Sequence, residues 1–270
     1  MRVADHVVQA RRERLALLLK QHQYLPIAEV CARLGVSEPT ARRDLAALAK
    51  EHTITRTRGG ALVEYNQKFP SFRDRLTQGT GGKRAIADAA YRLLRPGQTV
   101  WLDGGTTLYA VAERIAARPL DGLTVVTNNM PAAELLADID ALAVHLLGGQ
   151  YFRRSSLLLG GKSLEAAKLW SFDVALLGAE GITGEGFWNS LADVVTLQRL
   201  IVAGARRNVV CLDATKVGRS GPELLLGVDG VHAVLSDAPA SLFRDAGVRL
   251  GAGQLIRATV NETKGKKASS

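Results

Sequence analysis

The 270-residue sequence has few aromatic residues and no apolar run long enough to cross a membrane. Aromatic residues make up 5% of the chain. No uninterrupted apolar stretch reaches the roughly 18 residues that a membrane-spanning helix requires. The opening residues, MRVADHVVQARRER, lack the apolar centre of a secretory signal peptide. We therefore expect a cytoplasmic protein.

Cysteine is also scarce. Cys31 and Cys211 lie far apart, each within an apolar run, without the close spacing of a metal or redox pair. Free thiols in such surroundings usually pack in a core, and we expect that of both. The sequence predicts no metal site and no resident cofactor.

Positive charge and glycine are abundant. The formal net charge is +9, the sequence pI is about 9.8 and there are 27 glycines. The length fits two domains, although one large α/β domain would also fit. A polyanionic partner is compatible with this charge, but residues 1–65 hold only a net +4. The local arrangement of basic residues must therefore show whether the chain binds a polyanion such as DNA.

The first sixty residues have the pattern of a helix-turn-helix. Residues 11–22 carry leucines at helical spacing, and Pro26 begins a second helix that Gly35 ends. Ser37 is a candidate N-cap for a third helix that runs to about Lys50. The second helix of such a unit can enter the DNA major groove with its first turns against the base edges.

Basic side chains lie off the apolar face of this third helix. One arginine can read a guanine edge while its neighbour grips a phosphate, and Asp44 is expected to pair with a neighbouring base or to orient an arginine. The following HTITRTRGGALV alternates as a two-stranded wing would, turning at Gly59–Gly60. The alternative is a small helical domain with a solvated basic face. The candidate DNA-binding residues are Ser37, Glu38, Thr40, Arg42, Arg43, Arg56 and Arg58.

The rest of the chain predicts a second domain. We assign residues 1–63 to a winged helix-turn-helix, 64–82 to a linker, 83–258 to an α/β domain and 259–270 to a disordered tail. Apolar strands alternate with helices after the linker, which indicates a parallel sheet covered on both faces.

Polar and glycine-rich loops follow the strands, and in a parallel sheet they gather at one edge, where ligands usually bind. WLDGGTTLYAVAERI runs from a strand into a helix whose N-terminus would attract an anion. Neither an ATP-binding nor an NAD-binding glycine pattern is present. The alternative is that these residues only make turns. The candidate effector-binding residues are Asp103, Gly104, Gly105, Thr106, Thr107, Thr127, Asn128, Gly148, Gly149, Gly178, Glu180 and Lys216.

These side chains suit a small phosphorylated polyol. Thr106 and Thr107 would hold the phosphate, Asp103 and Asn128 the hydroxyl groups, and Lys216 would supply positive charge.

The chain resembles the DeoR-type bacterial repressors of sugar operons over about residues 8–240. The resemblance rests on the VS-x-x-T-x-RRDL run followed by R-x-x-GGA, and on WLDGGTTLYAVAERI, LTVVTNN, LLGGQY, LGAEGI and CLDATKVG. It implies a sugar-phosphate isomerase-like fold for residues 70–255. It further implies a phosphorylated sugar as effector, and a homo-oligomer that releases operator DNA.

Two positions depart from that pattern or extend it. Gln198 stands where relatives commonly carry lysine, which removes a cation from the pocket edge or from its support. Trp188, in a glycine-rich loop, could stack on the ligand or buttress a turn.

An enzyme is the alternative function. Asp103, Glu180 and Lys216 could supply acid–base groups to a sugar-phosphate isomerase with an appended DNA-binding domain. No arranged base and acid is evident, so we predict no catalytic residue and a regulator.

Overall fold

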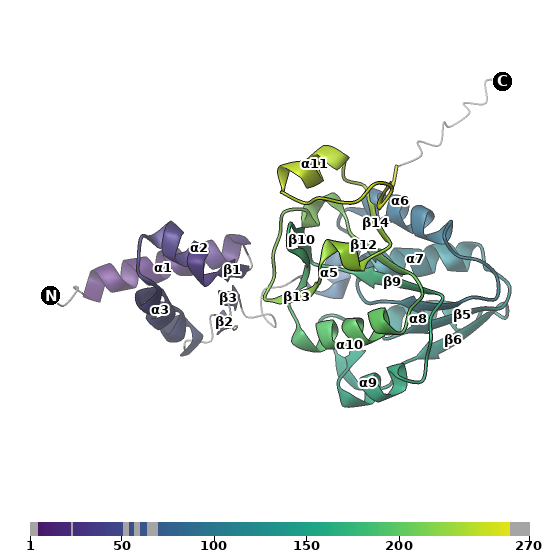
Figure 1. The fold of residues 1–270 in the computed structure, drawn as a ribbon. Coiled ribbons are helices and arrows are strands. Elements are labelled where there is room, and N and C mark those ends of the chain that lie inside the picture. The colour runs from purple at the N-terminus through teal and green to yellow at the C-terminus, as the bar shows by residue number, and fades with distance from the viewer. Residues whose placement is uncertain (1–4, 23, 51–53, 57–59, 64–69, 260–270) are drawn as a thin grey trace, which may run out of the picture.

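A computed structural model describes residues 5–22, 24–50, 54–56, 60–63 and 70–259 of the protein. Figure 1 shows a small helical N-terminal domain followed by a larger α/β domain. The predicted tail beyond residue 259 and residues 64–69 of the predicted linker lie outside the described residues.

The N-terminal domain is a helix-turn-helix with a small antiparallel sheet. Its order is α1 (Asp5–His22), β1 (Tyr24–Pro26), α2 (Ile27–Leu34), α3 (Glu38–Lys50), β2 (Ile54–Arg56) and β3 (Gly60–Val63). Gly35 ends α2 in the left-handed conformation, at φ 64°, and its N–H donates to the carbonyl of Cys31. This is the conformation that glycine adopts at low cost, and it sets the tight turn before α3.

The wing differs from its prediction in one respect. The expected pair, β2 and β3, is antiparallel, but β1 adds a third strand on the other side of β3. The core beneath the wing joins all three helices. Its buried members are Leu15, Leu19, Leu25, Val30, Ala41, Leu45 and Leu48, with Cys31 packed against them as predicted.

The second domain is built on a seven-stranded parallel sheet. In spatial order its strands are β15 (Leu255–Arg257), β14 (Ala233–Ser236), β12 (Asn208–Cys211), β9 (Val174–Gly178), β4 (Thr99–Leu102), β5 (Leu123–Thr127) and β6 (Leu142–Leu146). Alternate side chains of one strand reach opposite cores: Val100 and Leu102 enter one, and Trp101 enters the other. This confirms the expectation of a parallel sheet covered on both faces.

Helices cover both faces of this sheet. The first core is closed by α6 (Thr80–Tyr91), α7 (Thr106–Ala117) and α8 (Met130–Leu136). The second is closed by α9 (Gly161–Ala167), α10 (Ala192–Ala203) and α11 (Ala240–Asp245). Two smaller sheets add β10 (Gly181–Thr183), β11 (Gly186–Asn189) and β13 (Glu223–Leu226), and the hairpin of β7 (Gln150–Phe152) and β8 (Leu157–Leu159).

The second domain begins before the predicted residue 83. Within the predicted linker, Ser71 and Asp74 form a capping box that starts α5 (Phe72–Leu76). Phe72 is buried and meets the ring of Tyr109 edge-on, with centroids 5.6 Å apart. The short helix is therefore packed against α7.

Candidate functional site

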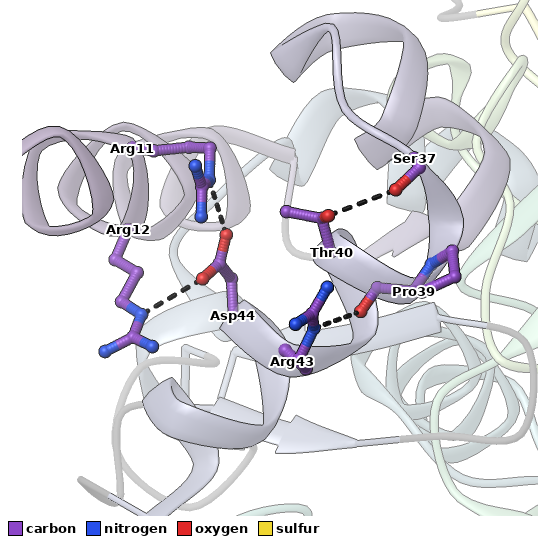
Figure 2. Close-up of polar contacts among 7 residues, drawn as sticks. All are labelled: Arg11, Arg12, Ser37, Pro39, Thr40, Arg43 and Asp44. Atoms are coloured by element: carbon purple, nitrogen blue, oxygen red, sulfur yellow. Dashed lines mark hydrogen bonds and ion pairs between the residues drawn. The ribbon is translucent and has the colours of Figure 1, made fainter. Parts of the chain in front are cut away.

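The first turns of α3 present the predicted polar residues on an exposed surface. Figure 2 shows Ser37 and Thr40 joined through their hydroxyl groups at 3.0 Å, and Arg43 donating through Nε to the carbonyl of Pro39 at 3.2 Å. Arg42 is about half exposed and pairs with Glu38 one turn earlier, at 2.6 Å. Exposed pairs of this kind contribute only about 0.3–0.5 kcal/mol, so Arg42 can exchange Glu38 for a phosphate.

Asp44 does not pair with Arg42 or Arg43. Its carboxylate is 2% exposed and accepts Nε of Arg11 at 2.6 Å and Nε of Arg12 at 3.1 Å, both from α1 (Figure 2). Burial by itself would raise the pKa of Asp44, but the hydrogen bonds and charges of the two arginines outweigh it and hold that pKa below its usual value. Asp44 thus orients arginines of a different helix.

The wing arginines are placed only in part. Arg56 is the last residue of β2, and its side chain lies outside the described residues, as does the whole of Arg58. Their contact with DNA stays a prediction.

A cavity of about 450 Å³ opens at the carboxyl ends of β4, β9 and β12. Eight of the twelve predicted effector-binding residues line it: Asp103, Gly104, Gly105, Thr106, Thr107, Gly178, Glu180 and Lys216. The structure therefore brings these eight residues together at the sheet edge where ligands usually bind in parallel sheets.

Four predicted residues do not line the cavity, because β5 and β6 lie to one side of it and the β7–β8 hairpin covers their ends. The Thr127 hydroxyl is buried and donates to the carbonyl of Leu102 at 2.5 Å. Asn128 is 1% exposed, and its backbone carbonyl accepts the N–H of Leu158 from the hairpin. Gly148 and Gly149 also lie away from the cavity.

These two glycines shape a turn. The Gly148 carbonyl accepts the Ser163 hydroxyl at 2.5 Å. Gly149 has φ 142°, and a Cβ there would lie 2.6 Å from the carbonyl oxygen of Leu159. Backbone conformation and close packing explain the pair without a ligand.

The N-terminus of α7 faces this pocket without a side-chain cap. Its N-cap is Gly105, at φ 92°, a residue with no side chain to cap the helix. Thr106 is buried and Thr107 is half-buried. Unpaired N–H groups at a helix start attract an anion, and the helix dipole adds to this attraction.

Asp103 is held from the α10 side of the pocket. Its Oδ2 accepts the N–H of Gly178 at 2.9 Å and Nε2 of Gln198 at 2.5 Å. The Gln198 amide also donates to the Gly178 carbonyl at 2.8 Å and accepts Nδ2 of Asn189 at 2.7 Å. Burial raises the pKa of Asp103, and these amide donors oppose the rise. A neutral amide donor therefore holds Asp103 at position 198, where the resemblance predicts lysine in relatives.

Glu180 lies at the same edge of the pocket. It accepts the hydroxyl of Ser190, and its own N–H donates to Asn189 Oδ1 at 3.0 Å. Burial raises the pKa of the Glu180 carboxyl. Asn189 thereby connects Glu180 to Gln198.

Two lysines bring positive charge to the cavity. The sequence missed Lys83, whose ammonium donates to the carbonyls of Arg75 at 2.5 Å and of Gln78 at 2.6 Å, at the end of α5. Burial lowers the pKa of Lys83 and of Lys216. Other lining residues that the sequence missed are Arg75, Gln78, Asn189, Asp213, Arg219 and Asp237. Lys83 directly follows the predicted linker and precedes the first strand of the parallel sheet, so the pattern of polar residues after strands does not include it.

Trp188 and Cys211 have structural explanations. Trp188 Nε1 donates to the Thr183 hydroxyl at 2.9 Å across the β10–β11 hairpin, so the residue buttresses a turn. Cys211 lines the pocket, and burial raises the pKa of its thiol to about 12. Within the described ranges there is no cluster of three or more His, Cys, Asp or Glu side chains that could hold a metal, and none of the helices there could cross a membrane.

Comparison with known proteins agrees with both domains. Residues 11–67 match the DeoR-like helix-turn-helix domain, and residues 79–238 match the DeoR C-terminal sensor domain. The chain belongs to the DeoR family of sugar-operon repressors. It is a DNA-binding transcriptional repressor with an N-terminal winged helix-turn-helix and a C-terminal α/β sensor domain, as the sequence predicted.

Curated relatives of this DeoR-family repressor are similar along nearly their whole length. The transcriptional repressor GlcR of Bacillus subtilis is 30% identical over 91% of this chain and 96% of its own. The glycerol-3-phosphate regulon repressor of Escherichia coli is 30% identical over 82% of this chain and 88% of its own. A solved ribose 5-phosphate isomerase A from Neisseria gonorrhoeae aligns with 50% of this chain and 52% of its own, at 15% identity and a TM-score of 0.37.

Proposed function

We propose that this DeoR-family repressor controls a sugar or polyol catabolic operon, and that a phosphorylated sugar or polyol bound in the pocket releases it from its operator. The observation that carries the proposal is the uncapped start of α7 in a cavity that also contains Lys83 and Lys216. A helix N-terminus and ammonium groups together favour a phosphate. The hydroxyls of Thr106 and Thr107 lie in the same first turn and can donate to it.

The Asp103 side of the pocket would bind the rest of the effector. The Asp103 carboxylate, whose Oδ2 already accepts from Gly178 and Gln198, would also accept a hydrogen bond from a ligand hydroxyl. A phosphate and several hydroxyl groups are the features of a sugar phosphate. The name of the glycerol-3-phosphate regulon repressor, one of the similar proteins, supports a phosphorylated polyol.

Release from DNA requires the effector to prefer one arrangement of the repressor over another. We propose a homo-oligomer that places two α3 helices on repeated half-sites of an operator, in the bacterial cytoplasm where the chromosome lies. The residues that contact the DNA are then Ser37, Glu38, Thr40, Arg42, Arg43, Arg56 and Arg58. The coupling between effector and DNA would be about 5- to 150-fold in affinity.

An isomerase-like enzyme is the second candidate, and the hydrogen bonds of the pocket disfavour it. Asp103 and Glu180 would have to exchange protons with a substrate, yet Asp103 is bound by two amide donors and Glu180 by Ser190. Repressors, not isomerases, are the relatives at 30% identity. We propose that the pocket binds its ligand without turnover and needs no cofactor.

The test measures binding of a fluorescent duplex from the promoter region next to the gene, with and without a panel of sugar and polyol phosphates. Fluorescence anisotropy should show release by at least one phosphorylated compound and no release by its unphosphorylated parent. Equal release by both would contradict the phosphate assignment. Conversion of any panel member, followed by NMR, would favour the isomerase instead.

A further inference from the structure

We propose that Arg11 and Arg12 of α1 form a second DNA-contacting site, a phosphate clamp that buried Asp44 holds in place beside the recognition helix. The proposal rests on the DNA-binding function of the N-terminal domain and adds residues outside the helix-turn-helix surface proposed above. Its ligand is the phosphate backbone of duplex DNA, at a position next to the groove that α3 enters.

The two arginines are anchored in a way that leaves their outer nitrogens available. Each guanidinium uses Nε for the Asp44 carboxylate, at 2.6 Å for Arg11 and 3.1 Å for Arg12. Among the described residues, no hydrogen bond or ion pair engages their Nη groups. The side chains are 18% and 29% exposed, whereas Asp44 is 2% exposed. A guanidinium fixed through Nε can still present its two Nη groups to a phosphate bidentately.

The pair meets α3 next to the predicted groove-reading residues. Arg43 and Asp44 lie three and four residues after Thr40, so each is a neighbour of Thr40 on the helix, Arg43 on the exposed side and Asp44 on the buried side that meets α1. Figure 2 shows Arg11 and Arg12 reaching α3 at Asp44, the residue that follows Arg43. The guanidinium groups that Asp44 holds therefore lie beside the helix that enters the groove.

Asp44 fixes the two arginine side chains in position, which exposed charges without a buried partner would lack. Free arginine side chains lose rotamer entropy when they bind, and a buried carboxylate that fixes two of them in advance removes part of that cost. The geometry therefore assigns Asp44 a positioning role and assigns phosphate contact to Arg11 and Arg12.

The test uses the intact protein and the salt dependence of its affinity. Binding to the promoter duplex and to an unrelated duplex of equal length is measured by anisotropy at several salt concentrations. Arg12→Gln should lower the slope of log K against log[salt] by about 0.9, the value for one phosphate contact, on both duplexes. Arg206→Gln is the matched control, because it removes one charge at an 85% exposed position in the sensor domain. It should leave the slope unchanged.

A second variant separates phosphate contact from folding. Arg12→Lys keeps the charge beside Asp44 but loses the planar guanidinium that binds a phosphate through two N–H groups. We expect about tenfold weaker binding to both duplexes with unchanged thermal unfolding. Wild-type affinity in Arg12→Lys, or a wild-type slope in Arg12→Gln, would overturn the clamp. Loss of promoter binding by Arg43→Ala in the same assay would still support the helix-turn-helix function, so the two outcomes are distinguishable.

Discussion

Gln198 of α10 donates its side-chain amide to Oδ2 of Asp103, at the end of β4, across 2.5 Å. The same amide group accepts a hydrogen bond from Asn189 on β11 and donates to the Gly178 carbonyl at the end of β9. One buried neutral side chain therefore connects three elements around the pocket. Because this side chain is neutral, the positive charge in the pocket comes from the α7 terminus and from Lys83, Lys216, Arg75 and Arg219, which also line it.

We expect Gln198→Lys to strengthen phosphate binding. An ammonium beside Asp103 would add one positive charge to a low-dielectric cavity, where charges interact more strongly than in water. The expected gain is about five- to tenfold in affinity for inorganic phosphate, or roughly 1–1.4 kcal/mol, measured by calorimetry. The control is Gln198→Met, which should bind phosphate no tighter than the wild type. Tighter binding by Gln198→Met as well would show that charge is not the cause.

Arg43→Ala and Lys216→Gln should separate the two activities of the protein. Arg43 lies on the exposed face of α3, so its loss should weaken promoter binding by about 1–3 kcal/mol and leave effector binding intact. Lys216 lies in the pocket, so Lys216→Gln should weaken effector binding and leave promoter binding intact in the absence of effector. Anisotropy and calorimetry on both variants test this. A variant that lost both activities while remaining folded would contradict the assignment of DNA binding to α3 and of effector binding to the pocket.

The sequence predicted eight residues that line the cavity because strand ends of a parallel sheet meet at one edge: Asp103 and Lys216 follow central strands, and Gly178 ends one. It could not show that β5 and β6 lie toward the side, nor that the hairpin carrying Leu157 covers Asn128. Periodicity identifies a strand but not its place in the order of the sheet. The sequence therefore predicts Thr127 as an effector-binding residue, whereas its hydroxyl donates to the backbone carbonyl of Leu102.

Contacts between distant residues were also beyond sequence reasoning. Asp44 and Arg11 are 33 residues apart, and Asp103 and Gln198 are 95 apart. Helical spacing places Asp44 at the edge of the apolar face of α3, which does not reveal that α1 lies against it. Lys83 of α6 lines the pocket and donates to carbonyls at the end of α5, whereas the polar composition of residues 64–82 predicts a linker there.

Cys211 should be inert to alkylation although it lines the pocket. With its pKa raised to about 12, the thiol carries almost no thiolate at pH 8, and thiolate is the reactive form. Mass spectrometry after brief treatment with iodoacetamide should find Cys31, which is half-buried, modified well before Cys211. Both should react at similar rates in 6 M guanidinium, about the concentration that unfolds most domains. Equal rates in the folded protein would show that the pocket exposes and activates the Cys211 thiol.

Asp44→Asn should destabilise the N-terminal domain in a pH-dependent way. The folded pKa of Asp44 lies below its ordinary value of 3.8, so the carboxylate stabilises the fold fully above that value. The contribution is lost as the pH falls through the lowered folded pKa. Because the carboxylate is buried and paired twice, the substitution should cost about 2 kcal/mol at pH 7.

The measurement is denaturant unfolding of the wild type and of Asp44→Asn at several pH values, followed by a probe that reports the N-terminal helices. The difference in unfolding free energy should be constant from pH 7 to about pH 5 and should shrink below pH 3.8, because protonated Asp44 then resembles asparagine. Glu38→Gln provides the comparison: Glu38 is 54% exposed in its pair with Arg42, and its substitution should change stability by less than about 0.5 kcal/mol at any pH. A difference for Asp44→Asn that grew as the pH fell would mean that the two arginines of α1 do not stabilise the carboxylate, and the positioning of Arg11 and Arg12 would lose its physical basis.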